Sequence, residues 1–325
     1  MRRAAKTKRR ARFASAMTIA TVSFAGSTAC ADEGGVSFWL PGQYGSFAAI
    51  APAPGFSMAT VSYFYSGSAG ASRPLQLGNT LDFGVKGEFF GQFLAPSYAP
   101  DTTFLGGRPN FSLAFMPAWS SASVSGQLGP FGAAKSESVT GFSDLYPTAQ
   151  LFWNSGVHNW MTYVTGDIPV GSYDPNRLVN IGIGHGAVDF GGAYTFLDPK
   201  TGWEFSATAG VTFNLENPST DYTNGIDAHL DWGASKFLNQ QLFVGAVGYF
   251  YQQLTPDRGQ PAILGDFESR AVGIGPQIGY NFDAGGVPIY TNLRGYFEVD
   301  TKNRLGGGSV LLTLSVPISA LAHGN

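Results

Sequence analysis

The strongest constraint on this chain is a strict alternation of apolar and polar residues between positions 203 and 214. Every odd position from Trp203 to Phe213 is apolar, and every even position from Glu204 to Asn214 is polar or glycine. Successive side chains of a β-strand point to opposite faces, so the segment is predicted to be a strand with one apolar and one polar face. A helix, at about 100° per residue, would mix both residue types around its axis.

The same alternation recurs along most of the chain. It predicts twelve strands, at 57–66, 79–94, 108–119, 143–153, 157–170, 186–197, 203–214, 224–234, 240–254, 267–283, 287–300 and 309–317. In the second of these, Leu81, Phe83, Val85, Phe89 and Phe93 form the expected apolar side. The ninth strand is apolar on both faces, which leaves its orientation open.

The connections between these strands alternate between short and long. Residues 154–156, 198–202, 233–239 and 283–286 are short, whereas 171–185, 215–224 and 256–266 are long, and 120–142 is the longest predicted loop. Tight turns at one end and long loops at the other are typical of outer-membrane barrels. The segment 95–107 falls at the turn end and is too long for it.

Two architectures can bury twelve one-sided strands. In a soluble sandwich the apolar faces pack against one another, and in a membrane barrel they face lipid while closure removes every unpaired edge. The loop pattern favours the all-β, transmembrane antiparallel β-barrel with about 12 strands. Fourteen strands are the alternative, with 43–51 and part of 120–142 supplying the extra pair. The expected interfacial aromatic residues are Trp119, Trp153, Trp160, Trp203, Trp232, Tyr249, Tyr251 and Tyr280.

The N-terminus resembles an export signal. Seven of the 19 basic residues lie in the first twelve positions, a short apolar run follows, and Ala29-Cys30-Ala31 fits a cleavage site. We therefore expect a signal peptide at 1–31, a Gly/Pro-rich N-terminal arm at 32–56 that is tucked into the barrel mouth, and the barrel at 57–325. A basic arm for nucleic acid does not fit the apolar run, and Ser27 disfavours lipid attachment to Cys30.

Cleavage after Ala31 changes the charge and the chemistry of the chain. The 22 acidic residues remain against twelve basic ones, for a net charge of −10, and the single cysteine is lost. No disulfide or thiolate metal site is then available.

Several motifs resemble one known family. They include Pro169-Val170-Gly171-Ser172-Tyr173-Asp174, Thr212-Phe213-Asn214-Leu215-Glu216-Asn217, Asp227-x-His229-x-Asp231 and Gly248-Tyr249-x-Tyr251-Gln252-Gln253. In this order they are similar to the MetA-pathway of phenol degradation family of outer-membrane proteins. The resemblance spans roughly residues 40–317 and is dense between 144 and 280. It implies an outer-membrane β-barrel transporter found with aromatic-compound degradation and passing hydrophobic substrates.

The function expected from fold and resemblance together is an outer-membrane channel for passive uptake of small hydrophobic or aromatic compounds. A structural or adhesive barrel with no open pore is the alternative. The expected partners are membrane lipid and lipopolysaccharide, the small solutes, and the outer-membrane assembly machinery, with no nucleic acid. One departure concerns assembly: such barrels usually end on an aromatic residue, whereas Pro317–Asn325 follows the last strand here.

The polar faces of the strands supply the candidate pore lining. It comprises Asp82, Lys86, Glu88, Asp167, Glu204, Asp227, His229, Asp231, Arg294, Glu298 and Asp300. Eight acidic side chains against two fixed bases would favour cations or neutral solutes, or these residues only hydrate the interior. The outer-mouth loop candidates are Tyr173, Asp174, Arg177, Asp221 and Tyr222, of which Tyr173 and Arg177 are candidates for gating.

Catalytic and metal chemistry is disfavoured by spacing. Same-face neighbours on a strand lie about 6.6–6.8 Å apart, too far for Asp227, His229 and Asp231 to share one ion at about 2.1 Å. A Ser206–His229 pair would lack an acid on another element to orient the imidazole ring. The sequence therefore predicts no cofactor, no metal and no enzyme activity.

Overall fold

The computed structural model describes residues 36–74, 80–128, 131–259 and 268–321, and the predicted signal peptide lies outside this range. Its strands are β1 (Gly55–Pro74), β2 (Thr80–Ala99), β3 (Arg108–Ala114), β4 (Pro117–Leu128), β5 (Phe131–Phe142), β6 (Tyr146–Ser155), β7 (His158–Asp167), β8 (Ala187–Asp198), β9 (Trp203–Asn214), β10 (Asp227–Phe237), β11 (Leu242–Gln253), β12 (Arg270–Asp283), β13 (Pro288–Lys302) and β14 (Gly306–Val316). A short helix, α1 (Ile318–Leu321), follows β14.

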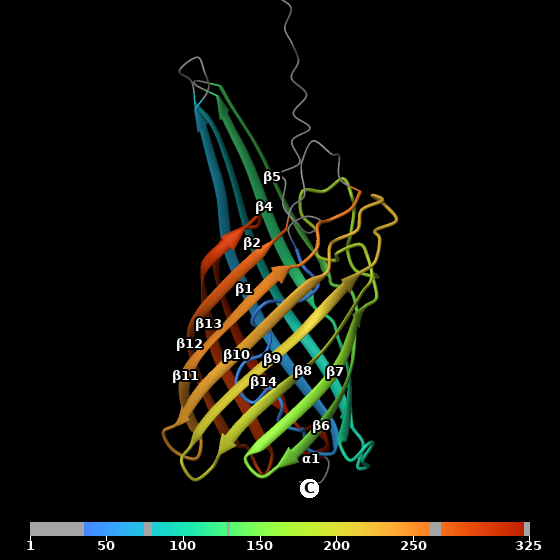
Figure 1. Ribbon diagram of the computed structural model, residues 1–325, viewed down its shortest axis with the longest axis vertical. Coiled ribbons are helices and arrows are strands. Elements are labelled where there is room, and N and C mark those ends of the chain that lie inside the picture. The colour runs from blue at the N-terminus through green and yellow to red at the C-terminus, as the bar shows by residue number, and fades with distance from the viewer. Residues whose placement is uncertain (1–35, 75–79, 129–130, 260–267, 322–325) are drawn as a thin grey trace, which may run out of the picture.

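The strands close into an antiparallel barrel (Figure 1). Strand β1 pairs with β14 on one side and with β2 on the other, and the ring continues from β14 down to β6, then through β3 to β2. Twelve strands make this ring in the described part of the chain, while β4 and β5 lie outside it. The predicted twelve-stranded barrel is confirmed, and closure leaves no edge inside the hydrocarbon region.

Strands β4 and β5 extend the barrel wall upward on one side. Strand β2 pairs with β3 near its lower end and with β4 along its upper half, and β4 pairs with β5. The resulting sheet of β1, β2, β4 and β5 rises above the rest of the barrel in Figure 1. The loop predicted at 120–142 is therefore wrong. Small residues dominate both faces of β4 and β5, so no clear apolar periodicity marked them as strands, and only the fourteen-strand alternative placed strand within 120–142.

The two ends of the barrel differ as the connection lengths predict. Strand pairs β6–β7, β8–β9, β10–β11 and β12–β13 are joined by tight turns at the lower end in Figure 1, and longer loops lie at the upper end. The segment 95–107 seemed too long for the turn end, but β2 continues to Ala99, so the connection to β3 is shorter than predicted. The remaining turn is anchored by Trp153, whose Nε1 donates to the Leu105 carbonyl at 3.1 Å.

The outward faces of β7 to β14 carry the apolar side chains, as predicted. Exposed residues there include Trp160, Phe190, Trp203, Phe205, Phe213, Leu230, Phe250, Ile278, Leu293, Phe297 and Leu312. Their inward neighbours, such as Glu204, Ser206 and Thr208 on β9, are fully buried. An apolar outside around a polar inside is the arrangement of a transmembrane barrel.

Strand β2 has the opposite orientation from the one predicted. Phe89 lies opposite Tyr65, whose hydroxyl bonds Glu298 inside the barrel, and Phe93 lies opposite Val61. Phe83, Val85, Phe89 and Phe93 therefore face inward rather than toward lipid. The alternation reports that a strand has two kinds of face, but it does not report which one faces the lumen.

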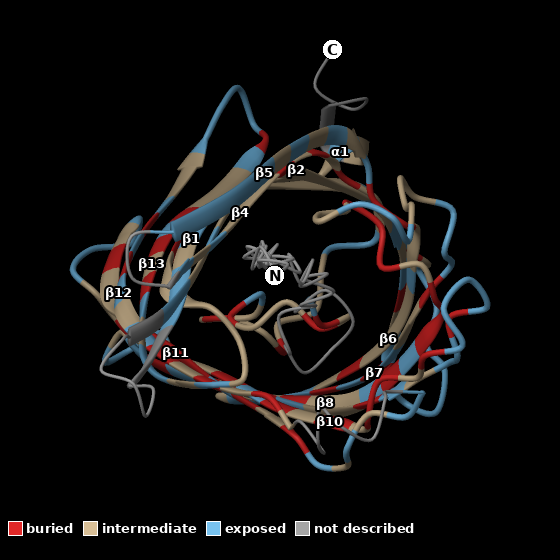
Figure 2. Ribbon diagram, turned by 90° about the horizontal axis from the view of Figure 1, so that it is seen from above, coloured by how far each residue is buried: buried red, intermediate tan, exposed pale blue. Residues whose placement is uncertain are grey.

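The N-terminal arm, residues 36–54, runs inside the ring of strands (Figure 2). It contributes no strand, so the alternative that assigned 43–51 to an extra strand is wrong. Its successive residues contact opposite walls: Trp39 packs with Phe152, Met161 and Tyr163, and Leu40 packs with a cluster that contains Tyr249. No helix among the described residues is long and apolar enough to cross a membrane.

Candidate functional site in the barrel lumen

A tight turn of the arm occupies the centre of the lumen. The Gln43 amide donates to the Leu40 carbonyl at 3.1 Å, and Gly42 has a φ of +81°. A Cβ atom on Gly42 would lie 2.8 Å from Tyr296 Cζ. Both the backbone conformation and the space therefore require glycine at this position.

Two charged side chains, one from β10 and one from β13, hold this turn. The Asp231 carboxylate of β10 accepts from the Gly42 amide at 2.9 Å and from the Tyr44 amide at 3.1 Å. On β13, Arg294 Nη1 donates to the carbonyls of Gly42 and Gln43 at 3.2 and 3.1 Å. The ionised groups pair with backbone dipoles of the arm, and charge-assisted bonds of this kind are the strong ones.

The lower part of the arm is held in the same way. Glu204 accepts from the Phe47 amide at 2.9 Å, and Thr195 Oγ1 accepts from the Ala49 amide at 3.0 Å. Ser46 donates to Ser235 at 3.3 Å and accepts from Gln277 Nε2 at 2.7 Å. The polar lumen thus binds the arm along its length, and the arm fills the space that a solute would cross.

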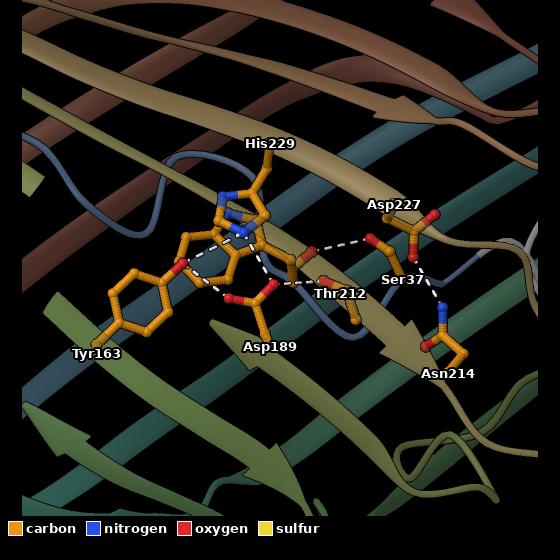
Figure 3. A network of polar contacts seen from close by, with 8 residues as sticks. Ser37, Tyr163, Asp189, Thr212, Asn214, Asp227 and His229 are labelled. Carbon is orange, nitrogen blue, oxygen red and sulfur yellow. Dashed lines mark hydrogen bonds and ion pairs between the residues drawn. The ribbon is translucent and has the colours of Figure 1, made fainter. Parts of the chain in front are cut away.

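A buried network beside Trp39 adds a second contact to the arm (Figure 3). Asp189 of β8 accepts from the Tyr163 hydroxyl at 2.7 Å and from Thr212 Oγ1 at 2.6 Å, and its Oδ2 lies 2.9 Å from His229 Nε2. The Trp39 ring stacks on His229 at 3.5 Å between centroids. Asp189 was not among the predicted lining residues. Its position between Val188 and Phe190, which face outward, is the sequence signal that it faces inward.

The other side of the lumen is aromatic. We call Tyr63, Phe89, Phe93, Tyr249, Tyr251 and Tyr296 the aromatic wall; together with Val247 and Leu311 they form one packed cluster on β1, β2, β11, β13 and β14. The Tyr63 and Phe89 rings lie 5.8 Å apart, and those of Tyr249 and Tyr296 lie 5.2 Å apart. The arm covers this wall, since Leu40 packs against it. Tyr249 and Tyr251 are buried inside the barrel, so the prediction that they lie at the membrane interface is wrong.

Three residues predicted to line the pore do not. Register places Asp82, Lys86 and Glu88 on the face of β2 opposite to Phe89, and all three are exposed. They project outside, above the membrane-facing part of the wall, because β2 presents its apolar face to the lumen. Their assignment to the lumen is a correction that follows directly from the inverted orientation of this strand.

Of the remaining predicted lining residues, Asp227 and Glu298 face inward and are already engaged, whereas neither carboxylate oxygen of Asp167 has a hydrogen-bond partner among the described residues and Asp300 is exposed. Asp227 accepts from Asn214 Nδ2 at 2.8 Å, and Glu298 accepts from the hydroxyls of Tyr65 and Tyr249, both at 3.0 Å. At the upper rim Asp300 pairs with Arg270 at 2.7 Å. Asp167 ends β7 on the inward face and is buried.

The predicted outer-mouth residues tie three loops together. The Tyr173 hydroxyl accepts from Asn217 Nδ2 at 2.7 Å, and the Tyr222 hydroxyl donates to Asp257 at 2.6 Å. Asp174 accepts from the Asn176 amide at 2.9 Å, and this backbone hydrogen bond, with the Asn176 side chain, lowers the pKa of its carboxyl. Arg177 and Asp221 are exposed members of the same loops.

Asp144 is a second structural carboxylate that sequence reasoning missed. It lies between β5 and β6 and accepts from the amides of Gly171 and Ile183 at 2.7 and 2.8 Å. The Ser172 amide donates to the Phe142 carbonyl at 2.9 Å. These bonds hold the loop 168–186 beside β5, whose backbone partner in the described sheet is β4.

Comparison with known proteins identifies the family. The model of the family described as putative MetA-pathway of phenol degradation matches residues 69–314. The chain belongs to this family. The resemblance seen in the sequence motifs is therefore confirmed, and no curated protein matches the sequence.

Solved structures support the fold of this family member. An outer membrane channel from Pseudomonas putida F1 is similar with a TM-score of 0.58 and 13% identity, covering 83% of this chain and 98% of the channel. A FadL homologue from Pseudomonas aeruginosa is 10% identical, with 80% and 89% covered and a TM-score of 0.38. The first likeness shows that the family member shares the fold of that channel.

In the described part of this family member, His229 does not hydrogen-bond Ser206, the serine considered in the sequence analysis. Its hydrogen-bond partners are Asp189 and Tyr163, and Ser206 instead bonds Thr195 and Glu204. Asp227 and Asp231 engage Asn214 and the arm. In the described part of the chain, no three His, Cys, Asp or Glu side chains are placed to hold a metal.

Proposed function

We propose that this protein is an outer-membrane channel for passive uptake of small hydrophobic or aromatic compounds. The observation that carries the proposal is the division of the lumen into a polar side, which binds the arm, and an aromatic wall. The arm covers this wall through Leu40 and through the hydrogen bond from the Tyr296 hydroxyl to the Gly42 carbonyl, so the wall would meet a solute once the arm shifts. Stacking and apolar burial on such a wall favour a phenol-sized ring over a hydrated ion. Large polar solutes are not expected to pass.

The arm is proposed to be the part that must shift for passage. Its hydrogen bonds to Asp231, Arg294 and Glu204 would have to break for this shift, and a hydrogen bond to a charged group contributes about 1.5–3 kcal/mol. A solute that binds the aromatic wall would compete with Leu40, which packs there. Passage then needs no energy input and no chemical step.

The test locks the arm to the wall. Ser46 and Ser235 lie 3.3 Å apart between their hydroxyls, so Ser46→Cys with Ser235→Cys can form a disulfide. In liposomes, we expect uptake of phenol by the oxidised double variant to fall to the protein-free rate and to recover on reduction. Each single cysteine variant is the matched control. Equal uptake in the oxidised and reduced forms would overturn the proposed role of the arm.

A structural or adhesive barrel without a path is the competing function. Flux separates the two, because a correctly folded wild-type barrel that passes no phenol above the protein-free rate rules uptake out. Conductance alone is a weaker criterion, since the preferred solutes are neutral.

The same proposal includes the route to the membrane. Residues 1–31 are proposed to be removed on export, so the mature chain should begin at Asp32, which intact-mass measurement of the purified protein checks. Insertion is proposed to use the outer-membrane assembly machinery although Pro317 follows β14, and lipopolysaccharide is proposed as a neighbour of the outer surface.

A further inference from the structure

A regular polar surface lies on the outside of the barrel, on the tall sheet of β1, β2, β4 and β5. Register aligns Ser66, Glu88, Ser121 and Ser138 in one row across the four strands. The next row up contains Ser68, Lys86, Ser123 and Ser136. We call these eight residues the serine face.

The serine face points away from the lumen. Tyr65 and Phe89 face inward, so their neighbours Ser66 and Glu88 face outward. The same alternation puts Ala118 and Val139 inward, where they pack with Met116 and Ile181. The serines of β4 and β5 therefore lie on the outer surface.

The row directly below fixes the height of the serine face. It holds Phe64, Phe90 and Trp119, which register places side by side. Phe64 and Phe90 are 43% and 46% exposed and continue the apolar surface of the barrel. Aromatic residues mark the hydrocarbon boundary in such barrels, and rows are about 6.6–6.8 Å apart. The serine face therefore begins at the level of lipid headgroups.

The serine face is hollowed. A depression of about 730 Å³ is lined by all eight of its residues, by glycines and an alanine between them, and by Glu137. A second one, about 450 Å³, continues upward past Asp82, Ser125 and Gln127. The first volume falls within the usual range of ligand sites, about 300–1,000 Å³.

The charged residues of the serine face indicate which class of ligand it can bind. Six hydroxyls, each both donor and acceptor, line the first depression with one lysine and two glutamates, Glu88 and Glu137, and the second depression adds Asp82. Phosphate recognition relies on arginine or clustered cations, which this surface lacks. Among the described residues, Lys86 and Glu88 form no ion pair with each other or with a neighbour. The surface therefore matches sugar hydroxyls better than phosphates.

We propose that the serine face binds the saccharide part of the outer-leaflet glycolipid, through sugar hydroxyls and not through phosphate groups. The glycolipid is the occupant because the face is continuous with the lipid-contacting surface, one row above its aromatic boundary. Sugars of a lipid anchored beside Phe64 and Phe90 lie at this height. The proposal concerns the outside of the barrel and is independent of solute uptake through the lumen.

The test uses the full-length, detergent-purified protein and two probes, lipopolysaccharide with a complete core and deep-rough lipopolysaccharide that lacks the outer core sugars. Glycolipid retained per barrel is counted by native mass spectrometry. Ser121→Ala with Ser123→Ala should weaken complete-core binding roughly tenfold, the loss expected for two hydrogen bonds. Ser121→Trp with Ser123→Trp fills the hollow and should abolish the preference for the complete core. Ser155→Ala and Ser155→Trp, at the opposite end of the barrel, are the matched controls.

Folding of each variant is checked by the heat-dependent shift in electrophoretic mobility that folded barrels show. Retention of the complete-core form that is unchanged in both double variants overturns the proposal. So does an equal loss for the two probes, which would assign binding to the lipid portion. Binding that falls steeply with added salt also overturns it, because that dependence belongs to phosphate contacts.

Discussion

Asp231 shows how a single side chain positions the arm. Its two carboxylate oxygens accept from two different backbone amides, those of Gly42 and Tyr44. The residue is 1% exposed, so a lost bond is not replaced by bulk water. An amide side chain has only one acceptor oxygen and would present a donor to the second amide.

The first prediction is that Asp231→Asn loosens the arm by about 1–3 kcal/mol, the cost of leaving a buried donor unsatisfied. In a chain that carries Ser46→Cys, the cysteine should react with a thiol reagent at a rate at least several-fold higher when Asp231→Asn is added. Asp101→Asn, at an exposed carboxylate in a lower turn, is the matched control and should leave the rate unchanged. Equal rates in all three proteins would show that Asp231 does not hold the arm.

The second prediction concerns Asp174 in the loop 168–186. The hydrogen bonds from Asn176 keep the pKa of this carboxyl below 3.8, its ordinary value. A lowered pKa stabilises the folded loop above the ordinary value, and this contribution is lost as the pH falls through the folded-state pKa. An NMR titration of the folded protein should give a midpoint below 3.8. Asn176→Ala, which removes the side-chain donor, should raise it, and a midpoint at or above 3.8 in the parent protein contradicts the contact.

At the scale of single elements, the sequence predicted strands better than it predicted their orientation. For β9 the polar and apolar faces differ so strongly that the lumen side follows at once, and Glu204 is inside as expected. For β2 the inward face is the aromatic wall, so an apolar face no longer means lipid. Strands β4 and β5 appeared only in the fourteen-strand alternative, because small residues on both faces leave no clear alternation of apolar and polar side chains.

The contacts of the arm could not be predicted from the sequence. Its Gly/Pro content predicted an irregular segment in the barrel mouth, and the structure places it deeper, between Asp231 and Arg294. No local pattern marks these partners, because Gly42 and Arg294 are 252 positions apart. A strand side chain meets the backbone of the arm only after the barrel has closed. A short stretch of sequence therefore carries no information about this contact.

The third prediction follows from the arm as a unit. Deleting residues 37–50 removes the partners of Asp231, Glu204 and Arg294 and leaves two of the three freed charges negative. We expect a several-fold larger conductance in planar bilayers and a preference for cations over anions, because charged groups in the lumen set selectivity. The same deletion with Asp231→Asn and Glu204→Gln is the control and should keep the larger conductance but lose the preference. Unchanged conductance would mean that the arm does not obstruct the lumen.

For the whole molecule, the separation of turns and loops fixes how the barrel sits in the membrane. The start of β1 and helix α1, together with the tight turns, lie at the lower end in Figure 1. Outer-membrane barrels keep short turns in the periplasm and longer loops outside. The connection lengths alone predicted this arrangement, because loop length is a local property of the sequence.

The fourth prediction tests that orientation in cells. Ser219 lies exposed in the loop between β9 and β10, and Ser155 lies exposed at the turn after β6. A membrane-impermeant maleimide should label Ser219→Cys in intact cells and should label Ser155→Cys only after the outer membrane is permeabilised. The two sites are matched in residue type and exposure, so the barrel orientation is the difference between them. The reverse labelling pattern would put the row of Phe64, Phe90 and Trp119 and the serine face on the periplasmic side. No glycolipid sugar reaches that side. The labelling experiment therefore tests both the topology and the proposed saccharide contact.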